Sequence, residues 1–534
     1  MINIDTCINA SNWKKEAYQH YVFYSPAQQV IAFLKQQIIA QGTTFNCFKI
    51  GFKHFYKPFA CLVINTLTGE FFLARDHFGL EPFYYTIISG ERNRLCFGSN
   101  LPDILAHVKN PVQDKQQISN VLMDICTSSL KYTDNTFYEN VFRVTPGHVL
   151  QLNLAQKHVE HRHAFWVLEP GTPKIHYASD ADYDAHFAFL LQEAIQVCCQ
   201  QSPDSVAMEF SGGLDTAAIF TACNTEGITP QLFMHVGEVD DERRYGDQLL
   251  HESKSTHPIH YVNADEFDVI AVLDQYKQWF AGGAPYLFFM FAQNIHQAVS
   301  QQGCKILLSG FGGDECVSSH APLRTYGADV GYKALWKELQ MTNSSDSSIR
   351  RLLQTLKLTQ PGLLYGLQCI KSYVSPLARR QVGVHYKPYC SLQEREHDWL
   401  QGRLSHHVRM RIEYSAVLAR YMGFTYQYPL LYPPLVEFCF LLPPEKKRRL
   451  GQNRLLMRRY LAQQVPSGLF NAHKKCGDIL PGTMPKCQQL YEKGKLNYSL
   501  RDLPYKPTYD YIKKNTLVSN NRLFHVDLLR YMFK

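Results

Sequence analysis

The sequence VAMEFSGGLDT, residues 206–216, is the stretch around which the rest of the chain is organised. An apolar run over 206–210 predicts a buried strand, and the apolar stretch after the two glycines predicts a helix. Adjacent glycines lack the Cβ atoms that keep a ligand away from the backbone. The Ser211 hydroxyl and successive backbone N–H groups would then face an anion at the positive end of a helix dipole. Asp215 has the wrong charge for a phosphate contact, so we expect it to bind Mg²⁺ on that phosphate. The predicted anion site comprises Ser211, Gly212, Gly213, Leu214, Asp215 and Thr216.

The loop differs from the phosphate-binding loop of kinases and GTPases, because it has no lysine and too few spacer residues. It resembles S-G-G-x-D-[ST], the pyrophosphate-binding loop of enzymes that split ATP between the α and β phosphates. The alternative is an ordinary glycine-rich turn between a strand and a helix.

Length and composition indicate a globular protein of two or more domains. The chain has 534 residues, 45% of them hydrophobic and 19% charged. The net charge of +8 is mild for this length and is not the concentrated basic patch of a nucleic-acid-binding protein. The 15 cysteines do not have the spacing of zinc ligands. No stretch has the about 20 consecutive apolar residues of a membrane-spanning helix, and the first residues lack the pattern of a signal peptide. We expect a cytoplasmic protein with reduced thiols, without nucleic-acid or membrane partners.

The first 168 residues predict a separate domain. Short β-like runs at 21–24, 61–65, 70–75, 83–88 and 95–98 are separated by turn residues, which indicates a layered, antiparallel β domain with helices. LARDHFGLEPFYY (73–85) resembles a segment of the glutamine-hydrolysing domain of asparagine synthetases. FGSNLPDILAH (97–107) and TFYENVFRVTPGH (136–148) follow the same family. The resemblance implies the fold of the N-terminal-nucleophile hydrolases.

The glutaminase reaction of that family implies a cysteine exposed by removal of the initiator methionine. Here Ile2 follows Met1, and the nearest thiols, Cys7 and Cys47, are internal. The acidic residue of the family's F-x-S-E segment is replaced at Ser99–Asn100. We therefore expect a degenerate glutaminase domain; Cys7 as a nucleophile after processing is the alternative.

A second domain is predicted over 175–534, after the Pro- and Gly-containing linker at 169–173. An amphipathic helix over 182–200 precedes the glycine loop, and strands and helices alternate after it. This alternation predicts a parallel α/β sheet with nucleotide at the carboxyl ends of its strands. By the resemblance, the strand 232–236 borders adenine, with backbone contacts from Met234 and Val236; the alternative is a core role for both.

ILLSGFGGDE (306–315) is a second strand followed by a glycine-rich, acidic loop. It resembles the S-G-x-G-G-D-E loop of asparagine synthetases, in which the backbone borders the nucleotide and the aspartate completes the metal site. The resemblance implies nucleotide contacts from Ser309 and Gly310, and Mg²⁺ held by Asp215 together with Asp314. Separate solvated acids are the alternative.

The segment 409–432 resembles R-x-E…G-x-E-x-R-x-P-F-L-D of the family, with departures. Thr425, Gln427 and Tyr432 replace the family's glutamate, arginine and aspartate. In asparagine synthetases this glutamate handles the aspartyl substrate, and in β-lactam synthetases a Tyr–Glu pair deprotonates the amine. Tyr426, Tyr428 and Tyr432 could participate here, or could simply line the core and cleft.

The C-terminal part is basic. Helical spacing is expected over 434–442 and 448–462, and the run EKKRRLGQNRLLMRR is interpreted as a solvated helix face or as a docking surface for an acidic partner. AHKKCGDILPG (472–482) resembles R-x-K-x-G, which implies that Lys475, or Lys474 beside it, neutralises pyrophosphate and the reacting carbonyl. The alternative for Lys475 is a surface charge.

The sequence thus resembles the asparagine synthetase superfamily over almost its whole length. The expected function is an ATP- and Mg²⁺-dependent ligase that adenylates a carboxylate and joins it to an amine, with Asp215, Asp314 and Lys475 in catalysis. The expected substrate is a small molecule or peptide that carries both the carboxylate and the amine, as in lasso peptide macrolactam cyclases. The expected partners are a precursor peptide or a pathway protease. Ammonia- or glutamine-dependent asparagine synthetase and an inactive nucleotide-binding scaffold are the alternatives.

Overall fold

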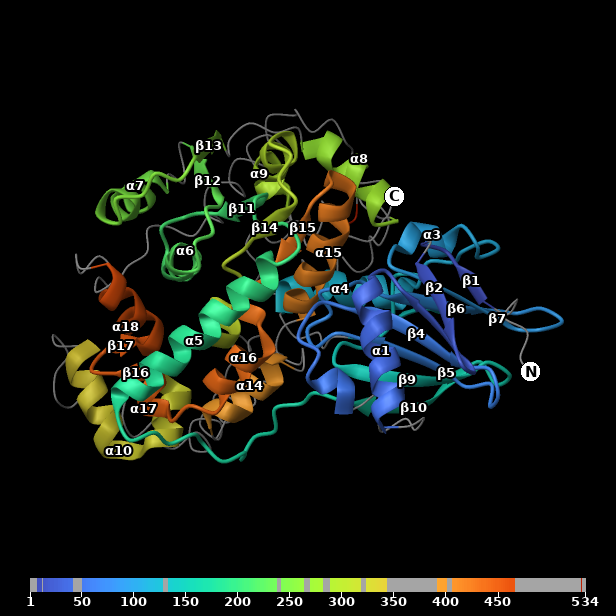
Figure 1. Cartoon of the computed structure of the whole chain (residues 1–534), viewed down its shortest axis with the longest axis horizontal. Helices are drawn as coiled ribbons and strands as arrows, with labels where there is room; N and C mark the ends of the chain where they lie inside the picture. Colours follow the sequence, from blue (N-terminus) through green and yellow to red (C-terminus); the bar gives the residue numbers. More distant parts are fainter. Residues whose placement is uncertain are drawn as a thin grey trace, which may run out of the picture.

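The computed structural model gives the chain two α/β parts joined along a long interface (Figure 1). No helix in the described part of the chain is both long and apolar enough to span a membrane. The structure describes residues 7–11, 13–41, 50–127, 133–237, 242–263, 269–281, 289–317, 323–342, 391–400, 406–465 and 530.

The N-terminal part is a sandwich of two sheets, with strand orders β1-β7-β6-β8 and β10-β9-β5-β4-β3-β2. All pairs are antiparallel except β1 with β7. The five strands predicted from the sequence are confirmed as β3 to β7. The strands are β1 (Cys7–Asn9), β2 (Lys14–Tyr18), β3 (Tyr21–Ser25), β4 (Ala60–Asn65), β5 (Phe71–Arg75), β6 (Tyr84–Ile88), β7 (Arg94–Gly98), β8 (Val141–Arg143), β9 (His148–Asn153) and β10 (His158–Ala164).

The central strands β4 and β5 are buried at every position. One face of them packs against the second sheet, where Leu62 and Phe71 meet Phe83 and Phe97. The other face packs beneath the helices, which is why these strands are apolar without alternation. The helices of this part are α1 (Gln28–Gln41), α3 (Leu101–Leu105) and α4 (Lys115–Thr127).

The second part is built on a five-stranded parallel sheet with the order β13-β12-β11-β14-β15. After β11 the chain adds β12 and β13 on one side of this strand, and it then crosses back to add β14 and β15 on the other side. Ligands of open parallel sheets bind where the connections diverge in this way, at the carboxyl ends of the strands. The strands are β11 (Val206–Glu209), β12 (Gln231–Val236), β13 (Ile259–Asn263), β14 (Ile306–Leu308) and β15 (Thr425–Gln427).

Helices cover this sheet, and the first of them begins with a capping box between Ser179 and Asp182. It confirms the predicted amphipathic helix. The helices are α5 (Asp180–Cys199), α6 (Leu214–Thr225), α7 (Arg243–Glu252), α8 (Val269–Trp279), α9 (Phe289–Gln301), α10 (Leu323–Thr342), α14 (Leu392–Leu400), α15 (His406–Met422), α16 (Pro433–Phe440), α17 (Pro444–Lys447) and α18 (Leu455–Gln464), with a π turn η2 (Gly313–Val317) and a 3₁₀ turn η3 (Pro429–Leu431).

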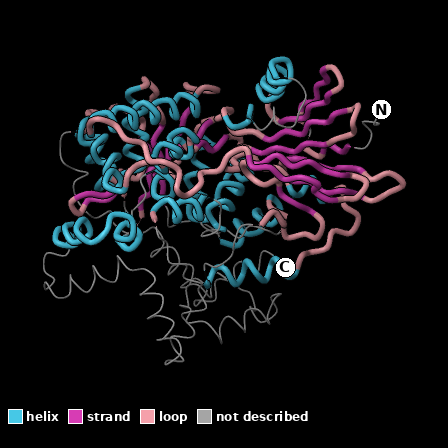
Figure 2. The backbone as a smooth tube through the Cα atoms, turned by 90° about the horizontal axis from the view of Figure 1, so that it is seen from below, coloured by secondary structure: helices cyan, strands magenta, loops and turns pink. Residues whose placement is uncertain are grey.

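The two parts share one continuous apolar cluster, which runs from Phe165 and Trp166 into the second part. Trp166 Nε1 also donates to Glu437 on α16, at 2.5 Å. In Figure 2 the strands of the N-terminal sandwich lie at one end of the molecule, with most helices at the other.

The basic stretch near the C-terminus differs from its prediction. Residues 448–453 form a short hairpin, β16 (Arg448–Arg449) with β17 (Gln452–Asn453), before α18 begins. Two of its cations are internal: Lys447 pairs with Glu396 at 2.6 Å, and Arg448 pairs with Glu338 at 3.3 Å. Arg449, in contrast, is 53% exposed. Lys447, Glu396, Arg448 and Glu338 are all buried. Because Lys447 and Arg448 are paired inside the fold, this part of the stretch is not a solvated helix face. The docking surface for an acidic partner stays a prediction.

Candidate active site

The SGGLD loop connects β11 to α6 as the sequence predicts. Gly213 is the N-cap of α6, so the first free N–H groups of the helix lie at this loop. The Ser211 hydroxyl accepts a hydrogen bond from the Gly213 N–H at 3.2 Å and lies 3.2 Å from the Thr216 hydroxyl. The two hydroxyls therefore hold the turn in shape at the positive end of the helix.

Gly212 has a requirement that the sequence did not indicate. Its φ is +62°, and a Cβ at this position would lie 2.4 Å from the backbone nitrogen of Gly246 on α7. The residue is glycine because the backbone of α7 packs directly against the loop. Glycine here serves the packing of two segments as well as any approach of a ligand.

A cavity of about 290 Å³ lies at the carboxyl ends of β11 and β14, and we call it the central pocket. It forms at the divergence point expected for a ligand site in a parallel sheet. Of the residues predicted from the sequence, those that line it are Ser211, Gly213, Leu214, Asp215, Thr216, Ser309, Gly310 and Asp314.

The second loop packs directly against the first. A Cβ on Gly313 would lie 2.0 Å from Asp215 Oδ1, and one on Gly310 would lie 3.2 Å from Asp215 Cβ. The loop after β14 can approach this closely only because both positions lack side chains. The prediction that the two loops meet at one edge of the sheet is confirmed.

Asp215 and Asp314 are joined by a residue that the sequence analysis did not single out. The Arg454 guanidinium, at the start of α18, pairs with Asp215 through Nη2 and with Asp314 through Nη1 at 2.6 Å. Arg454 has a left-handed backbone, with φ of +58°, and only 9% of its side chain is exposed. Arg454 lies within a basic run, so the sequence analysis did not single it out. The available signal was an arginine directly before the helix α18.

The two aspartates fit a magnesium ion by the chemistry of their donors. Mg²⁺ prefers hard oxygen ligands and is usually held by one or two carboxylates together with phosphate oxygens and water. Arg454 shows that both carboxylates can reach one cation. In the described part of the chain, no group of three or more His, Cys, Asp or Glu side chains is arranged around a metal position.

The wall formed by β12 contributes Phe233 and His235 to the pocket. Burial lowers the pKa of His235 to about 4, so its ring is neutral at physiological pH. The Met234 side chain is fully buried, and its Cε would lie 2.0 Å from a Cβ at Gly246. The backbone contacts of Met234 and Val236 with a base stay a prediction, and the predicted role of Lys475 or Lys474 lies outside the described residues.

Further pocket residues come from segments whose importance only the fold reveals. Arg411 of α15 lies over the Phe311 ring, 4.2 Å from its centroid. Burial raises the pKa of Glu315, whose carboxylate accepts from the Gly312 N–H at 3.0 Å. The lining residues that the sequence analysis missed are Glu209, Phe210, Phe233, His235, Glu242, Ala292, Ile295, Phe311, Glu315, Arg411 and Arg454.

The three tyrosines near Pro429 have different environments. Tyr426 lines the pocket, whereas Tyr428 stacks on Tyr426 at 5.5 Å and bonds to Ser415. Tyr432 packs edge-on against Tyr56 of the N-terminal part, at 5.6 Å. Tyr428 and Tyr432 therefore belong to the core and Tyr426 lines the cleft, and participation of the three in the reaction stays a prediction.

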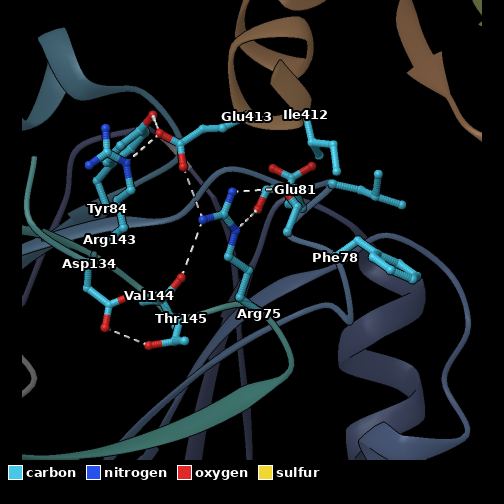
Figure 3. Close-up of polar contacts among 12 residues, drawn as sticks. Arg75, Phe78, Glu81, Tyr84, Asp134, Arg143, Val144, Thr145, Ile412 and Glu413 are labelled. Atoms are coloured by element: carbon cyan, nitrogen blue, oxygen red, sulfur yellow. Dashed lines mark hydrogen bonds and ion pairs between the residues drawn. The ribbon is translucent and has the colours of Figure 1, made fainter. Parts of the chain in front are cut away.

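The N-terminal part holds the second part through a buried ion cluster (Figure 3). Glu413 of α15 pairs with Arg143 at 2.7 Å and with Arg75 at 3.2 Å, and it accepts from the Tyr84 hydroxyl at 2.7 Å. The two arginines and Glu413 are 1–2% exposed. Arg75 belongs to the LARD segment, so this segment binds the neighbouring domain. Arg411, two residues before Glu413, faces the central pocket.

Comparisons with known proteins agree with this geometry. The asparagine synthase family model matches residues 186–503, and the glutamine amidotransferase domain model matches residues 51–166. Curated relatives include "Asparagine synthetase [glutamine-hydrolyzing] 2" of Bacillus subtilis (strain 168), 24% identical over 48% of this chain and 35% of the relative. Amidase chry2 of Gibberella zeae is 23% identical over 49% of this chain and 41% of the relative. Amidase chyE of Penicillium rubens is 24% identical over 50% of this chain and 42% of the relative.

The matched region therefore spans less than half of the length of each of these relatives. The asparagine synthase model, in contrast, covers more than half of this chain and includes both glycine loops, α15 and the start of α18. By this match, and by the pocket that the two loops form, the chain belongs to the asparagine synthase family.

Proposed function

We propose that this protein is an ATP-dependent ligase that forms an amide bond and releases AMP and pyrophosphate. The observation that carries the proposal is the convergence of the Ser211–Asp215 loop and Asp314 on one cavity at the start of α6. A helix N-terminus with a glycine loop binds a polyphosphate, and two adjacent carboxylates suit the cation that accompanies it.

The proposed chemistry follows from which residues would hold each part of a bound nucleotide. The loop and α6 would hold the β and γ phosphates, and Asp215 and Asp314 would hold Mg²⁺, which supplies charge neutralisation. Arg454 is close enough to exchange its carboxylate partners for phosphate oxygens. A substrate carboxylate would attack the α-phosphorus to give an acyl-adenylate and pyrophosphate, and a nitrogen nucleophile would then displace AMP. Positioning and neutralisation of charge provide most of the rate.

For the nitrogen source, we propose an amine on the substrate itself, as in a macrolactam-forming cyclase. Ser99–Asn100 replaces the acidic segment that the glutaminase family carries there. Asn100 is instead the N-cap of α3, and its amide donates to the Tyr421 hydroxyl of α15 at 2.8 Å. These contacts support a structural role for the N-terminal domain. The relative named as an asparagine synthetase favours a second candidate, synthesis of asparagine from aspartate.

The experiment is pyrophosphate–ATP exchange by the purified full chain with MgCl₂. The panel comprises aspartate, the other L-amino acids, and linear peptides that carry a side-chain carboxylate and a free amino terminus. Exchange with peptides and a product 18 Da lighter than the peptide would support the cyclase. Asparagine formed from aspartate with ammonia or glutamine would support the second candidate instead, and no exchange with any acid would indicate an inactive nucleotide-binding scaffold.

An Asp215→Ala variant provides the matched test of the site. We expect at least a hundredfold loss of exchange, because the cation loses one of its two carboxylates, with the far-UV circular dichroism unchanged. Exchange that survives in this variant would show that the loop is not the pyrophosphate site.

A further inference from the structure

One carboxylate in the central pocket has no role in the nucleotide site described above. Glu209 is the last residue of β11 and lines the pocket. Its Oε1 accepts from the Tyr426 hydroxyl and its Oε2 from the Ser309 hydroxyl, both at 2.6 Å. These three residues come from three neighbouring strands or strand ends, β11, β14 and β15. Each carboxylate oxygen is thereby fixed in position.

The partners of Glu209 in the described part of the chain are both uncharged hydroxyls. Of the nearby pocket arginines, Arg454 pairs with Asp215 and Asp314. Arg411 lies over Phe311, and its charge also acts on Glu315 and Tyr426. A half-buried carboxylate without a cation is costly unless it is hydrogen-bonded, and it attracts a cationic ligand. An ionised carboxylate has about four acceptor sites, and the two hydroxyls use two of them.

A third residue determines which member of this group can take a proton. His296 Nε2 lies 2.6 Å from the Tyr426 hydroxyl oxygen. Tyr426 donates its own proton to Glu209, so His296 donates its Nε2–H to Tyr426. Burial lowers the pKa of His296 to about 3, and burial together with the charge of Glu209 raises the pKa of Tyr426. His296 and Tyr426 are therefore neutral donors, and Glu209 is the base of the three.

We propose that Glu209 binds the nitrogen nucleophile of the amide-forming step and takes up its proton. Tyr426, Ser309 and His296 are positioning residues that hold the carboxylate toward the pocket. The inference rests on the proposed ligase function and assigns the substrate amine to this end of the cavity. Among the described residues Glu209 bonds only to hydroxyls, and an amine that arrives as an ammonium ion would supply a cationic partner.

The step balances as follows. The ammonium nitrogen gives one proton to the Glu209 carboxylate, and the lone pair that this frees forms the C–N bond to the acyl carbon. The nitrogen loses its second proton to solvent as the amide forms. The bond from that carbon to the AMP oxygen breaks, and its electron pair leaves with AMP. Glu209 then releases the proton to solvent. A basic group that acts in this way contributes about 10²- to 10⁴-fold to the rate.

The test compares two nucleophiles in wild type, Glu209→Gln and the control Glu160→Gln, which makes the same change on an exposed residue of β10. Each protein receives the acid that supports exchange in the wild type, with methylamine or hydroxylamine as the nucleophile. Methylamine is protonated at neutral pH and must lose a proton, whereas hydroxylamine is largely uncharged. Amides are quantified by mass spectrometry, hydroxamates by their iron(III) colour, and adenylation by pyrophosphate exchange.

We expect E209Q to retain exchange and hydroxamate formation within about threefold and to lose methylamide formation by about a hundredfold or more. Tyr426→Phe keeps the carboxylate but removes one donor, so methylamide formation should fall about tenfold with hydroxamate formation unchanged. Retained exchange also shows that the variants fold.

Equal loss of methylamide and hydroxamate in E209Q would overturn the inference, because a merely structural role affects both nucleophiles alike. Unchanged methylamide formation would overturn it as well. Absence of exchange in the wild-type protein would instead refute the proposed ligase function, so the two failures are distinguishable.

Discussion

Replacement of Glu413 by glutamine tests whether the buried ion cluster holds the two domains together. Oε1 of Glu413 accepts from Arg143 and Tyr84, both at 2.7 Å, and Oε2 accepts from Arg75 at 3.2 Å. A glutamine can keep its oxygen toward Arg143 and Tyr84, which leaves its amide donors facing the Arg75 guanidinium. The variant thus loses one hydrogen bond and the negative charge between two buried cations.

The expected cost is large because the three charged side chains are nearly inaccessible to water. Removal of one partner from a buried ion pair costs about 3–5 kcal/mol, and we expect about 3 kcal/mol for E413Q, since most of its hydrogen bonds survive. Arg75 keeps backbone partners, the carbonyl oxygens of Glu81 and Gly79 at 2.7 and 2.8 Å. With a denaturant slope of about 3 kcal/mol/M, the urea midpoint should fall by about 1 M.

The assay is equilibrium urea unfolding of the full chain, followed by tryptophan fluorescence. Glu139→Gln is the matched control, because Glu139 is an exposed residue of the same domain as Arg143 and its change should cost less than about 0.5 kcal/mol. If E413Q unfolds at the same urea concentration as E139Q, the reasoning about the cluster is wrong.

The pH dependence gives a second readout of the same cluster. Burial acts to raise the pKa of Glu413, but the guanidiniums of Arg143 and Arg75 outweigh it and hold the pKa below its ordinary value. A carboxylate with a lowered folded-state pKa contributes stability that is complete above its unfolded pKa, about 4.3, and is lost as pH falls through the folded value. The difference between wild type and E413Q should therefore persist at neutral pH and shrink only in acid below about pH 4.

Three further predictions concern the basic stretch and the central pocket. Lys447→Met leaves Glu396 buried without its cation and should lower the free energy of unfolding in urea by about 3 kcal/mol. The control Arg449→Gln changes a side chain that is 53% exposed and should cost under about 1 kcal/mol. Equal effects of the two changes would contradict the burial of the Lys447–Glu396 pair. Gly313→Ala forces a methyl group against Asp215 and should abolish exchange, whereas Gly90→Ala meets only one carbonyl oxygen at 3.3 Å and should retain it. Arg454→Met leaves Asp215 and Asp314 facing each other without the guanidinium that pairs with both. MgCl₂ without nucleotide should therefore raise the melting temperature of this variant more than that of wild type. An identical rise in both proteins would argue against a cation site there.

The site was most predictable where it lies next to a strand end. Both glycine loops follow apolar strands, and the carboxyl ends of parallel strands share an edge, so the meeting of Asp215 with Asp314 follows from local pattern and topology. The sequence analysis missed β1, β2, β8, β9 and β10. The edge strands β2 and β10 are largely exposed, so their sequences KKEAY and HVEHRHA carry no buried apolar face to signal a strand.

Residues that act through distant partners were not predictable in this way. Arg454 and Lys447 belong to one basic run, and their partners Asp215 and Glu396 lie 239 and 51 residues away in the chain. Charge in a sequence does not indicate burial, because burial of a cation depends on whether the fold supplies an anion at the same place. The same holds for Glu413, whose partners Arg75 and Arg143 belong to the other domain.

The sequence alone determined the two domains, the strand–loop–helix unit at 206–216 and the carboxylates of both glycine loops, because these depend on local periodicity and on short motifs. Tertiary structure decided which charges meet. It placed Arg454 between Asp215 and Asp314, brought the Tyr426 and Ser309 hydroxyls to Glu209, and seated Glu413 between two arginines. Hydrogen bonds and ion pairs act over a few ångströms, and only the folded chain brings residues so far apart in sequence within that distance.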